Sequence, residues 1–440
     1  MGIVEDALGH IDKASITQLT REMIDIPSPV GGEKELANYL AGRFQNAGLK
    51  ASIQEVEPNR FNVFGLLEGQ GGGPSLLYAG HLDSAYGGDE EGIAELGPGY
   101  QPKSWVEDDW IFGLGAYNMK GGHASAVLAV EALARSKAKL RGDLMIAGVV
   151  GETCHAPVAR YQGARYRACG VGARFMVANG IAADMCVIPE PTSNRVSVTS
   201  GGYVYFELTT RANAGATYRR GGTLSATNKP RDAIERMFDV IPVIKEWGDE
   251  FSSRNRYNNE PAGYADVIAI EGGHPFRPTK LACACRLYFE VGTMPGIRQN
   301  DVIQGLRDCT RELKQRDPDL DVEVKVVQTA QGAEVSPEET VVTALVEAHE
   351  QTWGKPPEVT WNGWYADTAP LTQAGIPAVC YGPQGRARSG GAGYAVEGEH
   401  VSIGDLRNGS EVFVRMAADV CMRDRASVLA PTTDTPGRGR

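Results

Sequence analysis

Short apolar stretches that stop abruptly at a polar residue constrain the fold of this chain more than any other feature. Three of them end at a side chain that can move a proton or bind a metal ion: Ser75–Gly80 at His81, Asp143–Val150 at Glu152, and Asp184–Pro189 at Glu190. Runs of this length that are apolar at nearly every position are typical of parallel strands buried on both faces. Because open α/β sheets bind their ligands beyond the carboxyl ends of such strands, the three side chains are expected to share one site.

Helical patterns separate the predicted strands. Apolar residues recur every four positions on one face of a helix expected over Glu33–Lys50, and small residues dominate another helix expected over Gly122–Lys137. This alternation predicts an α/β fold with an open, mostly parallel sheet. Ser84–Asp109 has the glycine, proline and acidic content of a loop, and loops longer than about 12–15 residues are uncommon unless they are functional.

The pattern changes after residue 201, which indicates an inserted domain. The new elements follow the order strand, helix, strand, strand, helix, strand of a ferredoxin-like unit, in Gly202–Ala212, Pro230–Trp247, Asp266–Glu271, Lys280–Val291, Asn300–Leu313 and Asp321–Val327. The α/β pattern then resumes with a helix over Pro337–Trp353 and a strand over Ala378–Gly382. We therefore predict a catalytic domain from 1–201 and 329–425, an inserted lid or dimerisation domain from 202–328, and a disordered tail from 426–440.

The charge balance excludes several classes of partner. Lys and Arg number 44 against 55 Asp and Glu, so the 440-residue chain carries a net charge of −11. Such a chain repels nucleic acid backbones and anionic lipids, so neither nucleic acid nor a membrane is expected as a partner. No apolar run reaches the about 18 residues of a membrane helix, and the eight cysteines show no metal or redox spacing. A cytoplasmic location with reduced thiols is expected.

The residues around the strand ends have identifiable chemistry. In His81-Leu82-Asp83, the imidazole and the carboxylate lie on the same side of an extended segment, and such a pairing fixes the imidazole tautomer. Glu152, just past its strand, can act as a general base if burial tunes it, although a capping or salt-bridged role is equally consistent with that motif alone. The segment Gly113–Gly122 matches neither a phosphate loop nor a dinucleotide fingerprint, and it carries Asn118.

Taken together, these segments resemble the metallopeptidase family of aminoacylase, acetylornithine deacetylase and succinyl-diaminopimelate desuccinylase. Segments that correspond to its H-x-D, G-x-G-A-x-D-M-K-G-G, D-E-E and E-P-T blocks occur here in this order, two of them with substitutions. The resemblance implies an enzyme that hydrolyses a C–N bond of a small carboxylate substrate. It also implies that the inserted domain is a dimerisation lid and that the chain forms a homodimer or a higher homo-oligomer.

This chain departs from the family pattern at the metal ligands. The family holds two metals with five ligands, and His81 and Glu190 fill the positions that serve one of them. The other three ligand positions are changed: the bridging Asp is Asn118, the second residue of the Glu pair is Thr153, and the C-terminal His aligns with Ala395. A lid His that assists the neighbouring subunit's site in the family, and is not one of the five ligands, aligns with Thr217. The resemblance therefore implies one weakly held divalent metal per chain, Mn²⁺ or Zn²⁺, bound by His81, Glu190 and Asn118. His400 is an alternative ligand, displaced by several residues.

A divergent branch of the family with Asn-Met-Lys in place of Asp-Met-Lys shares these departures. The resemblance to it implies conversion of 5-nitroanthranilate to 5-nitrosalicylate and ammonia, by attack of metal-activated water on the ring. Glu152 and Asp83 are the expected catalytic residues. Arg386 and Arg388 are candidates for binding the substrate carboxylate, and Tyr117 for an aromatic contact. Alternatively, Arg386 and Arg388 are solvated charges of a loop, and Tyr117 packs in the core.

Two other functions remain open at this point. The chain could be an N-acyl amino-acid deacylase or a small peptidase, like the better-known members of the family. It could also be a catalytically inactive member that binds or scaffolds other molecules, because expected ligands are missing. Retention of His81, Asp83, Glu152 and Glu190 together argues against the inactive alternative.

Overall fold

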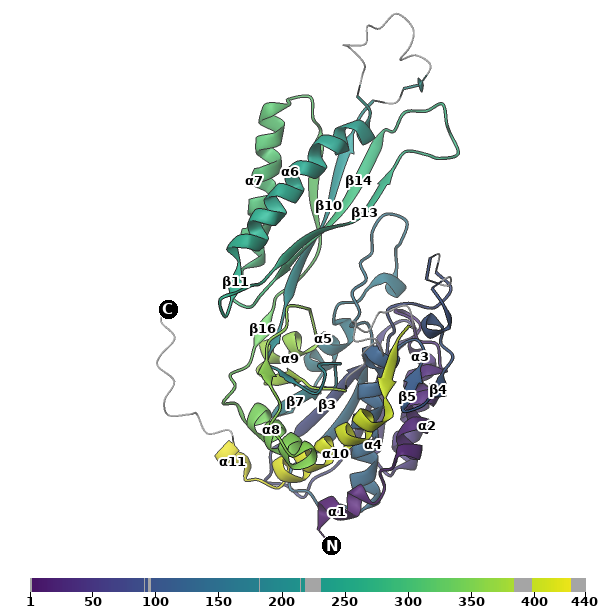
Figure 1. Cartoon of the computed structure of the whole chain (residues 1–440), viewed down its shortest axis with the longest axis vertical. Helices are drawn as coiled ribbons and strands as arrows, with labels where there is room; N and C mark the ends of the chain where they lie inside the picture. The colour runs from purple at the N-terminus through teal and green to yellow at the C-terminus, as the bar shows by residue number, and fades with distance from the viewer. Residues whose placement is uncertain are drawn as a thin grey trace, which may run out of the picture. The chain divides into compact units, whose positions relative to one another are not determined.

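The computed structural model describes residues 2–90, 92–93, 96–181, 183–213, 215–217, 231–383 and 398–428 (Figure 1). These residues form two compact units. The first takes the described residues of 1–199, 334–362 and 366–440, and the second those of 200–333 and 363–365. Both units combine helices with a sheet, which confirms the predicted α/β class.

An eight-stranded sheet forms the centre of the first unit, with the strand order β1-β2-β6-β3-β7-β18-β8-β17. Its strands are β1 (Lys50–Glu57), β2 (Arg60–Leu67), β3 (Leu76–His81), β6 (Leu144–Val149), β7 (Met185–Ile188), β8 (Val196–Ser197), β17 (Val359–Thr360) and β18 (Ala378–Cys380). The neighbours β6, β3, β7 and β18 run parallel. Every residue of β3 and β7 is buried, as their continuous apolar sequence predicts.

The antiparallel hairpin of β1 and β2 at the sheet edge differs from the prediction for this region. The helix expected over Glu33–Lys50 ends at Asn46, and Lys50 is the first residue of β1. Gly48 ends the helical path because its φ of +85° is readily adopted only by glycine. The residues of β1 are mostly polar and half-exposed, so they carry no apolar signal of a buried strand.

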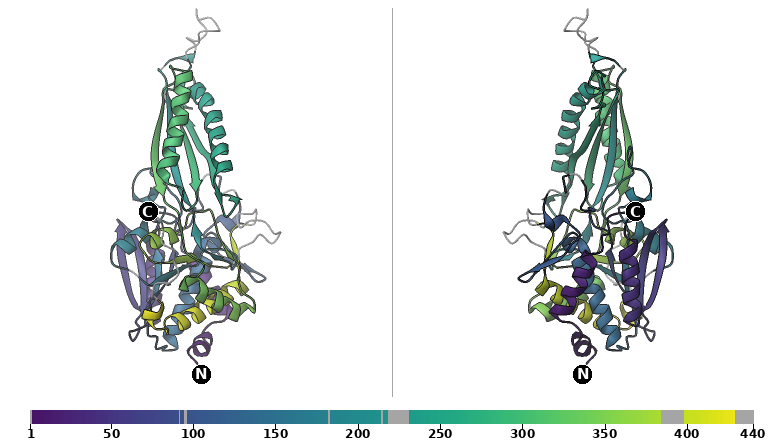
Figure 2. Two further views of the ribbon diagram at one scale, coloured as in Figure 1. Left: turned by 90° about the vertical axis from the view of Figure 1, so that its left-hand side faces the viewer. Right: turned by 90° about the vertical axis from the view of Figure 1, so that its right-hand side faces the viewer.

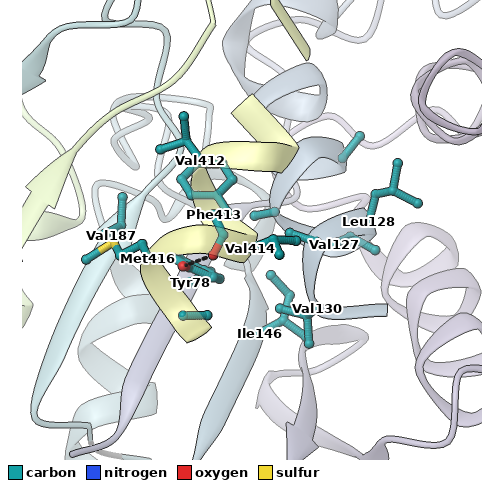
Figure 3. Packing of buried hydrophobic residues seen from close by; sticks show 14 of the residues in the cluster. Tyr78, Val127, Leu128, Val130, Ile146, Val187, Val412, Phe413, Val414 and Met416 are labelled. Atoms are coloured by element: carbon teal, nitrogen blue, oxygen red, sulfur yellow. Dashed lines mark hydrogen bonds between the residues drawn. The ribbon is translucent and has the colours of Figure 1, made fainter. Parts of the chain in front are cut away.

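Helices cover both faces of this sheet. One face carries α1 (Ile3–Leu8), α2 (Lys13–Ile24), α3 (Lys34–Asn46), α4 (Gly121–Arg135), α8 (Thr340–Trp353) and α10 (Ile403–Val420), whose apolar side chains form one large cluster. The other face carries α5 (Val171–Ala178) and α9 (Thr368–Gln373). Figure 3 shows the larger cluster around Phe413, where the Tyr78 hydroxyl donates a 2.7 Å hydrogen bond to the Phe413 carbonyl.

The second unit has a four-stranded antiparallel sheet in the order β13-β14-β10-β15. Its main elements are β10 (Gly202–Arg211), α6 (Ala233–Arg254), β13 (Tyr264–Gly272), β14 (Ala284–Thr293), α7 (Gln299–Arg316) and β15 (Val322–Ala330). This is the predicted strand-helix-strand-strand-helix-strand succession. Figures 1 and 2 show α6 and α7 side by side on one face of the sheet, where they bury its apolar residues. A small hairpin of β11 (Arg256–Tyr257) and β12 (Glu260–Pro261) follows α6.

A three-stranded sheet of β19 (His400–Ser402), β5 (Trp110–Phe112) and β4 (Trp105–Glu107) lies beside the turn that carries Asn118. β4 falls at the end of the expected loop Ser84–Asp109. The remaining short elements are β9 (Thr199–Ser200), β16 (Ala333–Glu334), α11 (Arg425–Val428) and two 3-10 helices, Pro98–Tyr100 and Ala164–Tyr166. Among the described residues, no helix combines the length and the apolar character needed to cross a membrane.

Candidate metal centre

The sheet order brings the three predicted strand-end residues together. β3 lies between β6 and β7, and the three strands run parallel. His81 is the last residue of β3 and is paired with Val149, the last residue of β6. Glu152 comes three residues after Val149. Glu190 follows the end of β7 by two residues. The carboxyl ends of three neighbouring parallel strands therefore carry the cluster, as the sequence predicts.

Three donor atoms of this cluster have the spacing of metal ligands. In the described part of the chain, His81, Glu152 and Glu190 form the one group of His, Cys, Asp and Glu residues whose ligand atoms all lie within 4.8 Å of one another. The Nε2 atom of His81 lies 3.6 Å from Oε1 of Glu190 and 3.8 Å from Oε2 of Glu152. All three side chains are buried.

Asn118 adds a neutral oxygen to the cluster. It lies in the turn Ala116–Lys120, and its Oδ1 is 3.0 Å from Nε2 of His81. The other ring nitrogen, Nδ1, lies 2.8 Å from the carbonyl oxygen of Asp83. When Nδ1 donates to that carbonyl, Nε2 and the Asn118 oxygen are both acceptors and need a cation or a proton between them. This donor set fits a divalent transition metal.

Asp83 plays a different part from the one expected. Its carboxylate lies 3.9 Å from Nδ1 of His81, too far for a hydrogen bond, and the main-chain carbonyl makes the imidazole contact instead. The carboxylate accepts hydrogen bonds from three successive backbone N–H groups, those of Gly151 at 2.7 Å, Glu152 at 3.1 Å and Thr153 at 2.9 Å. Asp83 therefore ties the His81 strand end to the Glu152 strand end.

The buried negative charges perturb one another. Burial, then the charges of Glu190 and Asp367, raise the pKa of Glu152 well above its ordinary value. Burial alone would lower the pKa of His81, but the negative charges of Asp83 and Glu190 raise it. Buried carboxylates that lie this close together are stabilised by a cation between them. The raised pKa values are therefore a second observation that fits a bound metal ion.

Asp367 is a site residue that the sequence reasoning did not select. It immediately precedes α9, its side chain is buried, and neither carboxylate oxygen has a hydrogen-bond partner among the described residues. Burial raises its pKa to about 7; the His81 charge opposes this shift, and those of Asp83 and Glu190 add to it. The sequence shows an acidic residue at the end of Trp364–Asp367, and this could have marked Asp367 as a candidate. Nothing in the sequence shows that its side chain is buried.

A buried arginine, Arg60, binds the segment that follows Glu152. Arg60 forms two bonds to Glu33, with Nη2 at 2.5 Å and Nε at 3.1 Å from the carboxylate oxygens, and both side chains are almost fully buried. It also donates to the carbonyls of Ala164 and Arg167 in the segment that follows Glu152. Its positive charge is attracted by the negative charges of Glu33 and Asp83.

The other predicted residues lie in four kinds of place. Tyr117 precedes Asn118 in the same turn, with its side chain half-buried. His400 lies outside the cluster, packed between Trp110 and Phe112 with ring centroids 5.2 Å away, so the structure does not support it as a replacement ligand. Thr217 lies in the second unit, where its N–H donates to the Thr279 carbonyl. The last three, Arg386, Arg388 and Ala395, lie outside the described residues.

A buried histidine and acidic residues at the carboxyl ends of parallel strands form a candidate metal centre on the α/β sheet, which is the arrangement of a metalloenzyme. The comparison with protein families agrees: the model of Peptidase family M20/M25/M40 matches residues 77–419, most of the chain. The chain belongs to this family, and it is a metal-dependent hydrolase of amide or other C–N bonds.

Curated relatives share about a quarter of their residues with the chain. The N-formyl-4-amino-5-aminomethyl-2-methylpyrimidine deformylase of Bacillus subtilis is 24% identical over 405 residues, covering 84% of this chain and 87% of the relative. The acetylornithine deacetylase of Salmonella arizonae is 26% identical over 352 residues, covering 79% of this chain and 82% of the relative.

Solved structures share the fold. Human carnosine dipeptidase 1 matches with a TM-score of 0.72 at 15% identity, covering 96% of this chain and 100% of that one. A tripeptidase from Staphylococcus aureus matches with a TM-score of 0.70 at 16% identity, covering 94% of this chain and 100% of the tripeptidase. At these identities, the likeness establishes the architecture and not the substrate.

Proposed function

We propose that this hydrolase releases ammonia from an aromatic amine, with 5-nitroanthranilate as substrate and 5-nitrosalicylate as product. The proposal rests on the resemblance to the divergent family branch that includes 5-nitroanthranilic acid aminohydrolase, which shares the Asn-Met-Lys turn. The observation that carries it is the composition of the site. The two ligands that serve only one metal of the family pattern, His81 and Glu190, are both present. At the ligand positions of the second metal, Asn118 and Thr153 stand in place of carboxylates.

Thr153 illustrates what the replacement does. Its hydroxyl is buried and has no hydrogen-bond partner among the described residues. A threonine hydroxyl does not carry the negative charge that a second divalent cation needs for compensation. We therefore propose one divalent metal, Mn²⁺ or Zn²⁺, held by His81, Glu190 and Asn118. When bound, it would supply Lewis-acid chemistry, lowering the pKa of a water molecule and polarising the substrate.

The chain's own residues would then move one proton. In the hydrolysis, a water oxygen bonds to the ring carbon, the bond from that carbon to the amine nitrogen breaks, and one proton passes from water to the departing amine. Glu152 would take this proton and return it to the nitrogen, ending the cycle unchanged. Asp83 would hold the Glu152 backbone through its three N–H contacts. The nitro group para to the amine accepts negative charge during the attack.

The substrate carboxylate needs a cationic or hydrogen-bonding partner. Arg386 and Arg388 remain our candidates for it, and Tyr117 for a contact with the ring. Tyr117 is favoured by its position next to Asn118, since the turn that presents the Asn118 oxygen also fixes the Tyr117 backbone.

Metal analysis tests the number of ions. We expect about one equivalent per chain after loading with Mn²⁺ and gel filtration under metal-containing buffer, because the one carboxylate among the three ligands cannot compensate a second divalent cation. Inductively coupled plasma measurements of metal against protein give the ratio. Two equivalents retained by the unaltered chain would refute the one-metal site.

Ammonia release tests the reaction itself. Protein supplemented with Mn²⁺ should release ammonia from 5-nitroanthranilate, and a parallel sample with excess chelator should release none. Formation of 5-nitrosalicylate in equal amount would be followed by chromatography. A folded, metal-loaded chain that releases no ammonia would refute the proposed reaction.

A deacylase or small peptidase is the second candidate, and the relatives favour it. Two of them are named as a deformylase and a deacetylase, which release small acyl groups. Release of a free amino acid from an N-acyl amino acid, without turnover of aromatic amines, would support this alternative.

We further propose that the chain assembles as a homodimer or a larger homo-oligomer. β13 is an edge strand of the second sheet and exposes Val267, Ile268 and Ile270. Exposed apolar edge strands are templates for pairing with another chain. Light scattering on the purified protein would give the number of subunits.

A further inference from the structure

The turn that carries Asn118 is wrapped around a carboxylate from the far end of the chain. Glu399 accepts hydrogen bonds from the backbone N–H groups of Tyr117, at 3.2 Å, and of Asn118, at 3.1 Å, both on the same oxygen, Oε2. Its side chain is only 1% exposed. Successive backbone N–H groups that converge on one point form a small anion-binding concavity, and here the chain fills it with its own carboxylate.

The main chain fixes Glu399 in this place. β19, which begins at His400, pairs antiparallel with β5, and β5 leads directly into the turn. The Gly113 N–H donates to the Glu399 carbonyl at 3.1 Å, and the Glu399 N–H donates to the Gly99 carbonyl at 3.2 Å. The carboxylate therefore reaches the turn from a residue whose own backbone is held on both sides.

A buried lysine holds the other end of the turn. Lys120 closes the same turn, its side chain is almost fully buried, and its Nζ donates to the Ile26 carbonyl at 2.8 Å. The turn is thus clamped through its backbone by Glu399 and through its last side chain by Lys120.

We propose that Glu399 is a positioning residue that holds the Asn118 amide oxygen against His81 for metal binding. The inference rests on the proposed function, because it takes Asn118 as a ligand. A neutral amide oxygen attracts a cation less than the carboxylate of the family pattern, so a freely moving Asn118 would contribute little. A backbone fixed at residues 117 and 118 keeps Oδ1 at its 3.0 Å distance from the imidazole nitrogen.

Mn²⁺ binding without substrate tests the inference. In Glu399→Ala, we expect the dissociation constant for Mn²⁺ to rise about 10- to 100-fold, the usual effect of removing a partner that orients a ligand. Added formate should restore part of the affinity by occupying the vacated N–H groups. Paramagnetic resonance of free Mn²⁺ measures binding. If Glu399→Ala fails to fold, Glu399→Met provides the test, since it keeps a side chain of similar length but has no oxygen to accept the two N–H bonds.

Two controls separate positioning from general stability. Glu131→Ala removes a carboxylate of equal burial on α4, which binds Arg43 of α3 and Arg135 of α4, and it should leave the Mn²⁺ dissociation constant unchanged. Because Glu399 acts through Asn118, the double variant Asn118→Ala/Glu399→Ala should bind Mn²⁺ no more weakly than Asn118→Ala alone.

The outcomes are distinct. Unchanged Mn²⁺ affinity in both Glu399 variants, equal losses in the Glu131 variant, or additive losses in the double variant would each overturn the inference. An unaltered chain that does not bind Mn²⁺ would overturn it as well. An unaltered chain that binds Mn²⁺ but releases no ammonia from 5-nitroanthranilate would refute the proposed reaction and leave the role of Glu399 supported by the binding data.

Discussion

Glu152→Gln should reduce the turnover number by about 10²- to 10⁴-fold, the range that a positioned general base contributes. The amide keeps the size of the side chain but cannot accept and return the proton. Mn²⁺ binding should persist, because His81, Glu190 and Asn118 are untouched. Steady-state ammonia release and metal analysis on the same preparation measure the two quantities separately.

Glu190→Gln is the matched comparison for this variant. It alters a carboxylate of the same cluster, and it should lose metal together with activity. Glu131→Gln, a buried glutamate far along α4, should retain both. A near-normal turnover number in Glu152→Gln would remove Glu152 from the mechanism.

Arg60→Met should lower the free energy of unfolding by about 3–5 kcal/mol, the cost of leaving one partner of a buried ion pair uncompensated. Glu33, which is fully buried, would lose both of its bonds to the guanidinium. The carbonyls of Ala164 and Arg167 would lose their donor as well. Urea unfolding followed by circular dichroism measures the change.

Two further variants check the cause of this loss. Arg167→Met removes an exposed arginine that pairs with Glu57 in the same region, and it should change stability by less than about 1 kcal/mol. The double variant Arg60→Met/Glu33→Gln should recover part of the stability that Arg60→Met loses, since no unpaired charge stays buried. Equal stability of the single and double variants would contradict the ion-pair explanation.

The sequence predicted those parts of the site that follow continuous apolar strands. The sequence places His81, Glu152 and Glu190 together because β3 and β7 are buried over their whole length, β6 is buried at every position but one, and a parallel sheet aligns their carboxyl ends. The ferredoxin-like succession was predictable for a related reason, since its long helices and strands have clear periodicity.

The contacts between distant segments were not predictable in this way. Glu399 meets residues 117 and 118 across more than 280 positions, and no local pattern marks such a pair. Asp83 was recognised as chemically important, but its carboxylate turned out to bind the backbone at residues 151–153 and not the imidazole. The edge strand β1 was missed because its residues are too polar and exposed to give a buried-strand signal.

The changed positions of the site share a location that bears on how such enzymes diverge. Asn118 lies in a turn and Thr153 lies past the end of β6, while the buried strands and helices of the first unit are apolar. Residues on connecting segments can be exchanged at little cost to folding stability, whereas residues inside the sheet cannot. A lineage could therefore change the number of metal ions and the reaction in a few substitutions, each tolerated by itself, while its scaffold stayed under constant selection.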